Sequence, residues 1–100
     1  MRIYISGAIT GTNDYMQRFL KAEENLKSDY SVVNPAVVCS MLPTNFTHSE
    51  YMDVCLVLLE KCDSIYMLKG WETSKGANIE LTYAKNRKMN ILYEENEDER

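Results

Sequence analysis

Two segments of this chain bring small residues, hydroxyl groups and a carboxylate together at spacings that suit chemistry on a small molecule. Residues 6–12 (Ser-Gly-Ala-Ile-Thr-Gly-Thr) form a stretch with two glycines between an apolar run and an amphipathic run. A loop of this kind exposes backbone N–H groups beside a helix N-terminus, an arrangement that suits a phosphate. It matches neither the GxGxxG pattern nor the Walker loop, so a plain tight turn is an equally good interpretation.

The second segment, residues 70–80, places Ser74, Gly76 and Glu80 at the start of a predicted helix. A glycine in the first turn costs about 1 kcal/mol of helix propensity relative to alanine, which predicts that something approaches the backbone closely there. Glu80 lies four residues after Gly76 and therefore on the same helix face, although an exposed helical glutamate is the commoner case. Trp71 offers an indole that either stacks on a base or covers the edge of the core.

Predicted strands and helices alternate along the chain and must position these residues. The strands are expected at residues 2–6, 31–33, 64–68 and 90–93, and the helices at residues 14–28, 47–61 and 74–87. Strand starts lie roughly 30 residues apart, which is typical of βαβ units in a parallel sheet with helices on both faces. We therefore expect a three-layer, flavodoxin-like (Rossmann-like) α/β fold with a four-stranded parallel sheet in the order 2-1-3-4.

The connecting segments carry further expectations. Thr12 or Asn13 is predicted to cap the first helix, and residues 47–50 (Thr-His-Ser-Glu) have the pattern of a capping box. The long stretch at residues 36–47 contains few pattern signals, and we expect a short helical turn around residues 37–41. Long loops in small domains often form lids or pocket walls.

On this fold the loops after the first and third strands meet at one edge of the sheet. A ligand is expected there, at the carboxyl ends of the strands. The two loops would build one pocket from two helix N-termini, the carboxylate of Glu80, the phenol of Tyr4 and the indole of Trp71. Such a pocket suits a phosphorylated, aromatic, sugar-containing ligand, which is a nucleotide.

The length of 100 residues, with 45% hydrophobic and 26% charged side chains, indicates one globular domain. Residues 94–100 carry five acids and one base, so they account for the whole net charge of −4. They form an acidic tail after a neutral nucleotide-binding domain at residues 1–93, and a neutral domain does not suit duplex nucleic acid. No apolar run approaches the roughly 20 residues that cross a bilayer, and no leader pattern opens the chain, so we expect a cytoplasmic protein without membrane contact.

The three cysteines, Cys39, Cys55 and Cys62, form no metal-binding pattern with the single histidine, His48. Their odd number and the lack of a secretory signal predict reduced thiols. Cys55 and Cys62 lie seven residues apart, so both are expected to fill one apolar helix face. We predict neither a metal nor a cofactor.

The opening residues, 1–11 (Met-Arg-Ile-Tyr-Ile-Ser-Gly-Ala-Ile-Thr-Gly), resemble those of the 2′-deoxynucleoside 5′-phosphate N-hydrolases, relatives of the nucleoside 2-deoxyribosyltransferases. Cys62-Asp63, a strand, and then Ser74-x-Gly76-x-x-x-Glu80 resemble their second motif. The whole pattern, with Asn34-Pro35 and Gly70-Trp71-Glu72, is closer still to a family of short phage and bacterial proteins of unassigned function within that superfamily. The resemblance covers residues 1 to about 93.

This resemblance implies a role for each matching residue. Glu80 matches the nucleophile that attacks C1′ of the deoxyribose, and Tyr4 matches the tyrosine that hydrogen-bonds this carboxylate. The loop that holds the 5′-phosphate matches Gly7, Ala8, Ile9 and Thr10, and its second wall matches Ser74 and Gly76. We add Gly11 and Trp71 to the expected binding residues. In the family, groups from a neighbouring subunit complete the site, which implies a homodimer or a higher homo-oligomer.

Two positions depart from the family pattern. The aspartate that orients the substrate and protonates the departing base falls on Cys55, while Asp53 lies on a different face of the same helix. Glu72 is an alternative acid. The basic residue found in the family's phosphate loop falls on Thr10.

The main hypothesis is an N-glycosidase, either hydrolase or transferase, acting on deoxynucleotides or deoxynucleosides. A nucleotide-binding or sensing module without turnover is the second, and a flavin-binding protein, suggested by residues 6–12, is the third.

Overall fold

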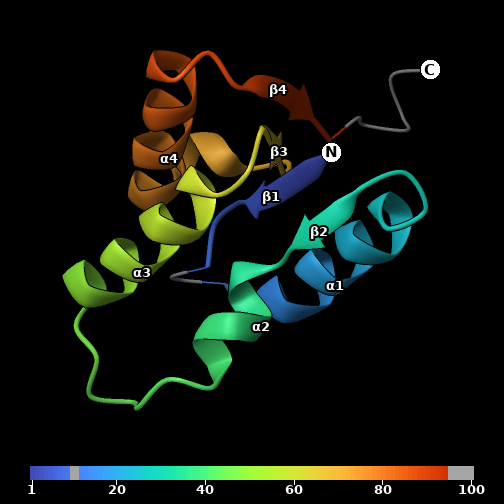
Figure 1. Cartoon of the computed structure of the whole chain (residues 1–100). Coiled ribbons are helices and arrows are strands. Elements are labelled where there is room, and N and C mark those ends of the chain that lie inside the picture. Colours follow the sequence, from blue (N-terminus) through green and yellow to red (C-terminus); the bar gives the residue numbers. More distant parts are fainter. Residues whose placement is uncertain (10–11, 95–100) are drawn as a thin grey trace.

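Four parallel strands form the centre of the computed structural model, which describes residues 1–9 and 12–94 (Figure 1). They are β1 (Arg2–Ser6), β2 (Ser31–Val33), β3 (Ser64–Met67) and β4 (Asn90–Tyr93). The strands pair in the order β2-β1-β3-β4, so the predicted order 2-1-3-4 is confirmed. In this register Tyr4 of β1 lies beside Val33 of β2 and Ile65 of β3.

Helices cover both faces of this sheet. They are α1 (Tyr15–Leu26), α2 (Pro35–Ser40), α3 (His48–Glu60) and α4 (Lys75–Asn86), with a 3-10 turn, η1 (Trp71–Thr73), before α4. In Figure 1, α1 lies on one side of β1 and β2, while α3 and α4 lie on the other. The predicted three-layer, flavodoxin-like α/β fold is therefore confirmed.

Side chains of β1 alternate between the two layers, as the pleat of a strand requires. Ile3 and Ile5 are buried against Phe19 of α1. Tyr4 points to the opposite face, where it is buried with Leu59 of α3 and Leu81 of α4. Because β1 is a central strand, both of its faces lie in the core.

Two of the three predicted helix caps are confirmed. The Thr47 hydroxyl accepts from the Glu50 N–H at 3.1 Å, and the Glu50 side chain accepts from the Thr47 N–H at 2.8 Å, which is a complete capping box. Ser74 caps α4 by accepting from the Ala77 N–H at 3.1 Å.

The predicted cap of α1 is wrong. Asp14 occupies the N-cap position, without a capping hydrogen bond from its side chain. The Thr12 hydroxyl instead donates to the Ile9 carbonyl at 3.0 Å, so it closes the preceding turn and is not available to the helix. The helical turn expected around residues 37–41 occurs slightly earlier, as α2, because Asn34 caps it and Pro35 fits its first position.

Within the described residues, no helix combines the length and the apolar character that crossing a membrane requires. Over the same part of the chain, no group of three or more His, Cys, Asp or Glu side chains gathers where it would hold a metal ion.

Candidate active site

Glu80 is a buried carboxyl group at the centre of the candidate site. It lies in the second turn of α4, and only 5% of its surface is exposed. The Tyr4 hydroxyl donates to its Oε2 at 2.5 Å, and the Ser6 hydroxyl donates to its Oε1 at 2.6 Å. Tyr4 and Ser6 are two residues apart on β1 and therefore face the same layer. Each carboxyl oxygen thus has its own hydroxyl donor, which fixes the orientation of the group.

Burial sets the electrostatics of this cluster. It raises the pKa of Glu80 to about 7, although the hydrogen bonds from Ser6 and Tyr4 oppose the shift. Burial, and then the nearby charge of Glu80, raise the pKa of Tyr4 well above its ordinary value. Tyr4 therefore stays a protonated donor, while Glu80 exchanges between acid and carboxylate near neutral pH.

A cavity of about 380 Å³ opens beside this cluster. Tyr4 and Glu80 form part of its lining, together with Gly7 and Ile9 after β1 and the first turn of α4. The facing wall comes from α2, the segment at residues 41–47 and the first turns of α3: Cys39, Ser40, Leu42, Thr44, His48, Tyr51, Met52 and Cys55. We call this surface the far wall.

Six of the ten site residues predicted from the sequence line this cavity. Those that do are Gly7, Ile9, Ser74 and Gly76, in addition to Tyr4 and Glu80. Ala8 is buried beside the cavity, and its carbonyl accepts from the Arg18 guanidinium at 2.9 Å. Trp71 packs against the core of the α3–α4 layer, with its ring 6.1 Å from that of Tyr93, and does not reach the described lining. Thr10 and Gly11 lie outside the described residues.

The close approach predicted at Gly76 has a structural cause within the chain. A Cβ on Gly76 would lie 3.1 Å from Sδ of Met52 in α3, so the glycine lets α3 and α4 come together. The predicted close approach to the Gly76 backbone is therefore confirmed, and the group that approaches it is the Met52 side chain. Gly7 is tighter still, because its Cβ would lie 2.9 Å from the Leu68 side chain.

Sequence reasoning missed Ser6 as a site residue. Its signal was the period of two along β1, which places Ser6 on the same face as Tyr4. Sequence reasoning also missed that Cys39 contacts Cys55, with their Sγ atoms 3.8 Å apart. Cys62, whose thiol donates to the Leu58 carbonyl, packs against the same apolar core as Cys55, as predicted.

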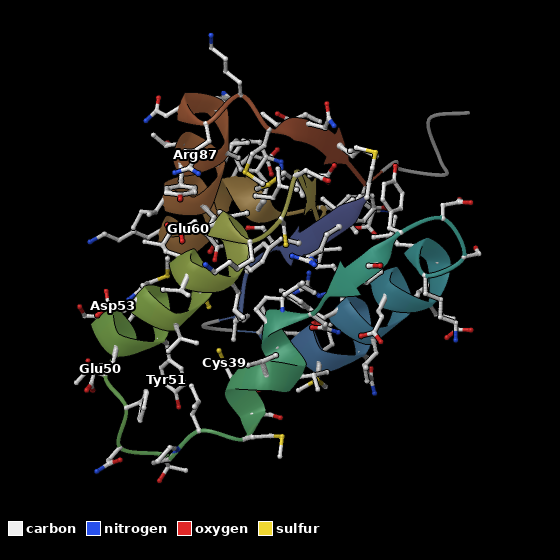
Figure 2. All side chains as sticks on the ribbon, in the orientation of Figure 1. Cys39, Glu50, Tyr51, Asp53, Glu60 and Arg87 are labelled. Carbon is white, nitrogen blue, oxygen red and sulfur yellow. The ribbon has the colours of Figure 1, made fainter. Side chains whose placement is uncertain are left out.

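The position of the expected family aspartate is occupied by a neutral thiol. Cys55 is 8% exposed, and burial raises its pKa to about 12. The two candidate acids, Asp53 and Glu72, are exposed and do not reach the described lining of the cavity. Figure 2 shows Asp53 on the outer side of α3, whereas Cys39 lies on the side of α2 that faces α3.

The whole domain that carries this site matches a known family. The family described as "Domain of unknown function (DUF4406)" matches residues 1–93. The chain belongs to this family. The DUF4406 match begins with β1 and ends with β4, so it includes Tyr4, Ser6, Glu80 and the far wall. No curated protein matches the chain.

Proposed function

We propose that this DUF4406 protein cleaves or transfers the N-glycosidic bond of 2′-deoxynucleosides or 2′-deoxynucleotides, with Glu80 as nucleophile. One observation carries the proposal: a buried carboxyl group lies at a cavity wall and each of its oxygens is held by a hydroxyl donor. A perturbed carboxyl group in a cleft is a recurring mark of catalytic sites. The resemblance to the deoxyribosyltransferase superfamily supplies the reaction.

The chemistry follows from the geometry of Glu80. One carboxylate oxygen forms a bond to C1′ while the C1′–N bond breaks and its electron pair leaves with the base. Attack of water on the resulting ester frees the sugar, whereas attack of a second base completes a transfer. Tyr4 and Ser6 keep the carboxyl group in place through both steps, because their hydrogen bonds do not depend on the substrate.

The cavity supports a small ligand of this class. Its volume of about 380 Å³ lies within the range of small-molecule sites, roughly 300–1,000 Å³. The far wall offers Tyr51 as an aromatic surface for a base, and Ser74 offers a hydroxyl near the N-terminus of α4. Completion of the site by a second subunit stays a prediction.

The test is release of free base from a panel of deoxynucleosides and their 5′-monophosphates, followed by chromatography. We expect release by the wild-type protein and a loss on the order of 10⁴-fold or more in Glu80→Gln. Release should rise with pH through a midpoint near 7, because only the ionised carboxyl group is nucleophilic. Glu72→Gln is the matched control, since Glu72 is exposed and should leave the rate unchanged. Equal rates in wild type and Glu80→Gln would contradict the nucleophile assignment.

A second candidate function is a nucleotide-binding module without turnover. The observation that favours it is Cys55, because a thiol with a pKa of about 12 is a poor acid for protonating a departing base. Saturable binding of a deoxynucleotide by the wild-type protein, without release of base from any substrate, would support this candidate over the enzyme.

A further inference from the structure

Cys39 and Cys55 form a pair of thiols in the cavity wall. Their Sγ atoms lie 3.8 Å apart, at the contact distance of a weak hydrogen bond between thiols. Cys39 comes from α2 and Cys55 from α3, and Figure 2 shows the Cys39 side chain directed toward α3. Both residues also line the cavity.

The two sulfurs need only a short movement to bond. A disulfide has an S–S distance of about 2.05 Å, so the atoms must approach by less than about 2 Å. The helices that carry the sulfurs are joined by residues 41–47, most of which have exposed side chains, so this connection leaves α2 room to shift relative to α3. A movement of α2 against α3 is sufficient.

We propose that Cys39 and Cys55 form a reversible intramolecular disulfide when the protein meets a low-molecular-weight disulfide. The Cys39 thiolate attacks one sulfur of the reagent and releases the other as a thiol, which leaves a mixed disulfide on Cys39. The Cys55 thiolate then attacks the Cys39 sulfur and releases the second thiol. The protein loses two protons and two electrons, and one reagent disulfide is reduced to two thiols.

Burial assigns the two thiols different roles in this sequence. Cys39 is the more exposed of the two and is therefore the point of entry, while the buried Cys55 resolves the mixed disulfide. Burial raises the pKa of both thiols, so few thiolates are present at neutral pH and the oxidation is slow. The Tyr4 hydroxyl and the Glu80 carboxyl group are the ionisable groups that act on Cys55 beside its partner.

The disulfide would change the cavity as well as the thiols. It draws α2 toward α3 and so narrows the space in front of Glu80. It also removes the Cys55 thiol that interacts with the Tyr4 hydroxyl, one of the two donors to Glu80. Oxidation is therefore expected to weaken ligand binding in the cavity, and reduction should restore it.

The test detects formation of the disulfide bond itself and does not depend on the proposed activity. The full chain is incubated with oxidised glutathione, its remaining thiols are alkylated after denaturation, and the product is examined by intact mass and peptide mapping. We expect the wild type to lose two hydrogens, to carry a Cys39–Cys55 cross-link and to be alkylated on Cys62. Cys62→Ser is the matched control and should form the same cross-link.

The single variants separate the two steps. Cys55→Ser should stop at a glutathione adduct on Cys39, and Cys39→Ser should form no cross-link. The thermal midpoint of the wild type should rise on oxidation and fall on reduction, because a cross-link constrains the unfolded chain. Persistence of the adduct on wild-type Cys39, a cross-link to Cys62, or three alkylated thiols after oxidation would overturn the proposal. If a serine variant fails to fold, mapping of the wild type and Cys62→Ser still decides it.

Discussion

The two walls of the cavity differ in secondary structure and in the burial of their side chains. One wall includes Tyr4 and Glu80, and Ser6 supports it from behind through its hydrogen bond to Glu80; all three are buried side chains on a central strand and a regular helix. The far wall consists of a six-residue helix, the segment at residues 41–47 and the first turns of α3, and many of its side chains are exposed or half-exposed. On the first wall each carboxyl oxygen of Glu80 is held by a hydroxyl donor, whereas the far wall relies on contacts such as the ring pair of Phe46 and Tyr51, 5.6 Å apart.

For the proposed function, this difference would separate two tasks of one pocket. A reacting group has to be held in one geometry, which the core of a sheet provides. A recognition surface has to fit the shape of its ligand, which connecting segments provide with less effect on the rest of the fold. The following variants test whether the two walls are as independent as their construction indicates.

The largest effect on stability is expected where Glu80 is replaced by its neutral isostere. The folded-state pKa of about 7 lies above the ordinary value of 4.5, so folding favours the protonated form. The stabilising contribution is therefore complete below about pH 4.5 and is lost as the pH rises through about 7. Relative to wild type, Glu80→Gln should gain about 3 kcal/mol between these limits, measured by urea unfolding at a series of pH values. Parallel curves for the two proteins would show that the carboxyl group is not buried.

A smaller effect, on turnover, is expected when one hydrogen-bond donor to Glu80 is removed. Ser6→Ala deletes a hydrogen bond to a charged group, which is worth about 1.5–3 kcal/mol, so turnover should fall on the order of tenfold to a hundredfold. The pH midpoint of turnover should also move upward, because this hydrogen bond lowers the pKa of Glu80. Ser64→Ala is the matched control, since Ser64 is equally buried but donates to Asp63. An unshifted midpoint in Ser6→Ala would mean that Tyr4 alone positions the carboxyl group.

The far wall should respond in affinity and not in turnover. Tyr51→Ala removes an aromatic ring from the cavity, and stacking of a base on such a ring is worth about 1–3 kcal/mol, so KM should rise about tenfold while kcat is retained. Tyr51→Phe keeps the ring, losing only a hydrogen bond to the Pro43 carbonyl, and should behave almost as wild type. A fall in kcat with an unchanged KM would show that the far wall also positions the reacting group, and that the two walls do not act independently.

The smallest effect is expected at the start of α3. Thr47→Ala removes the hydroxyl of the capping box and should cost about 1 kcal/mol of unfolding free energy, measured by urea unfolding. Turnover by the folded protein should be unchanged, because Thr47 does not touch the Glu80 cluster. Ser49→Ala, an exposed neighbour outside the box, serves as the control. A loss several times larger would show that the far wall is held cooperatively with the core.

Local patterns were sufficient to predict the fold. The spacing of apolar runs predicted the strand order, and the capping residues Thr47 and Ser74 predicted two helix starts, because these signals act over a few residues. The missed cap of α1 shows the limit of such signals. The sequence offers three polar residues in a row at positions 12–14, and only the turn that engages Thr12 decides among them.

The site was predictable in part. The position of Glu80 above Gly76 followed from helix geometry, whereas its burial did not, because burial depends on how β1 lies across α4. The contact between Cys39 and Cys55 could not be predicted from the sequence for a similar reason. It depends on the path of the connection between α2 and α3, for which the sequence carries no periodic signal.

The far wall is continuous along the chain. Its eight residues fall within seventeen consecutive positions, 39–55, and five of them fall within 42–52, whereas Tyr4 and Glu80 are separated by 76. A single synthetic cassette spanning positions 42–52 can therefore be randomised or exchanged between relatives while the hydroxyl and carboxyl cluster is left untouched. For the proposed function, ligand preference could therefore change through one short stretch of the gene while the Glu80 cluster stays the same.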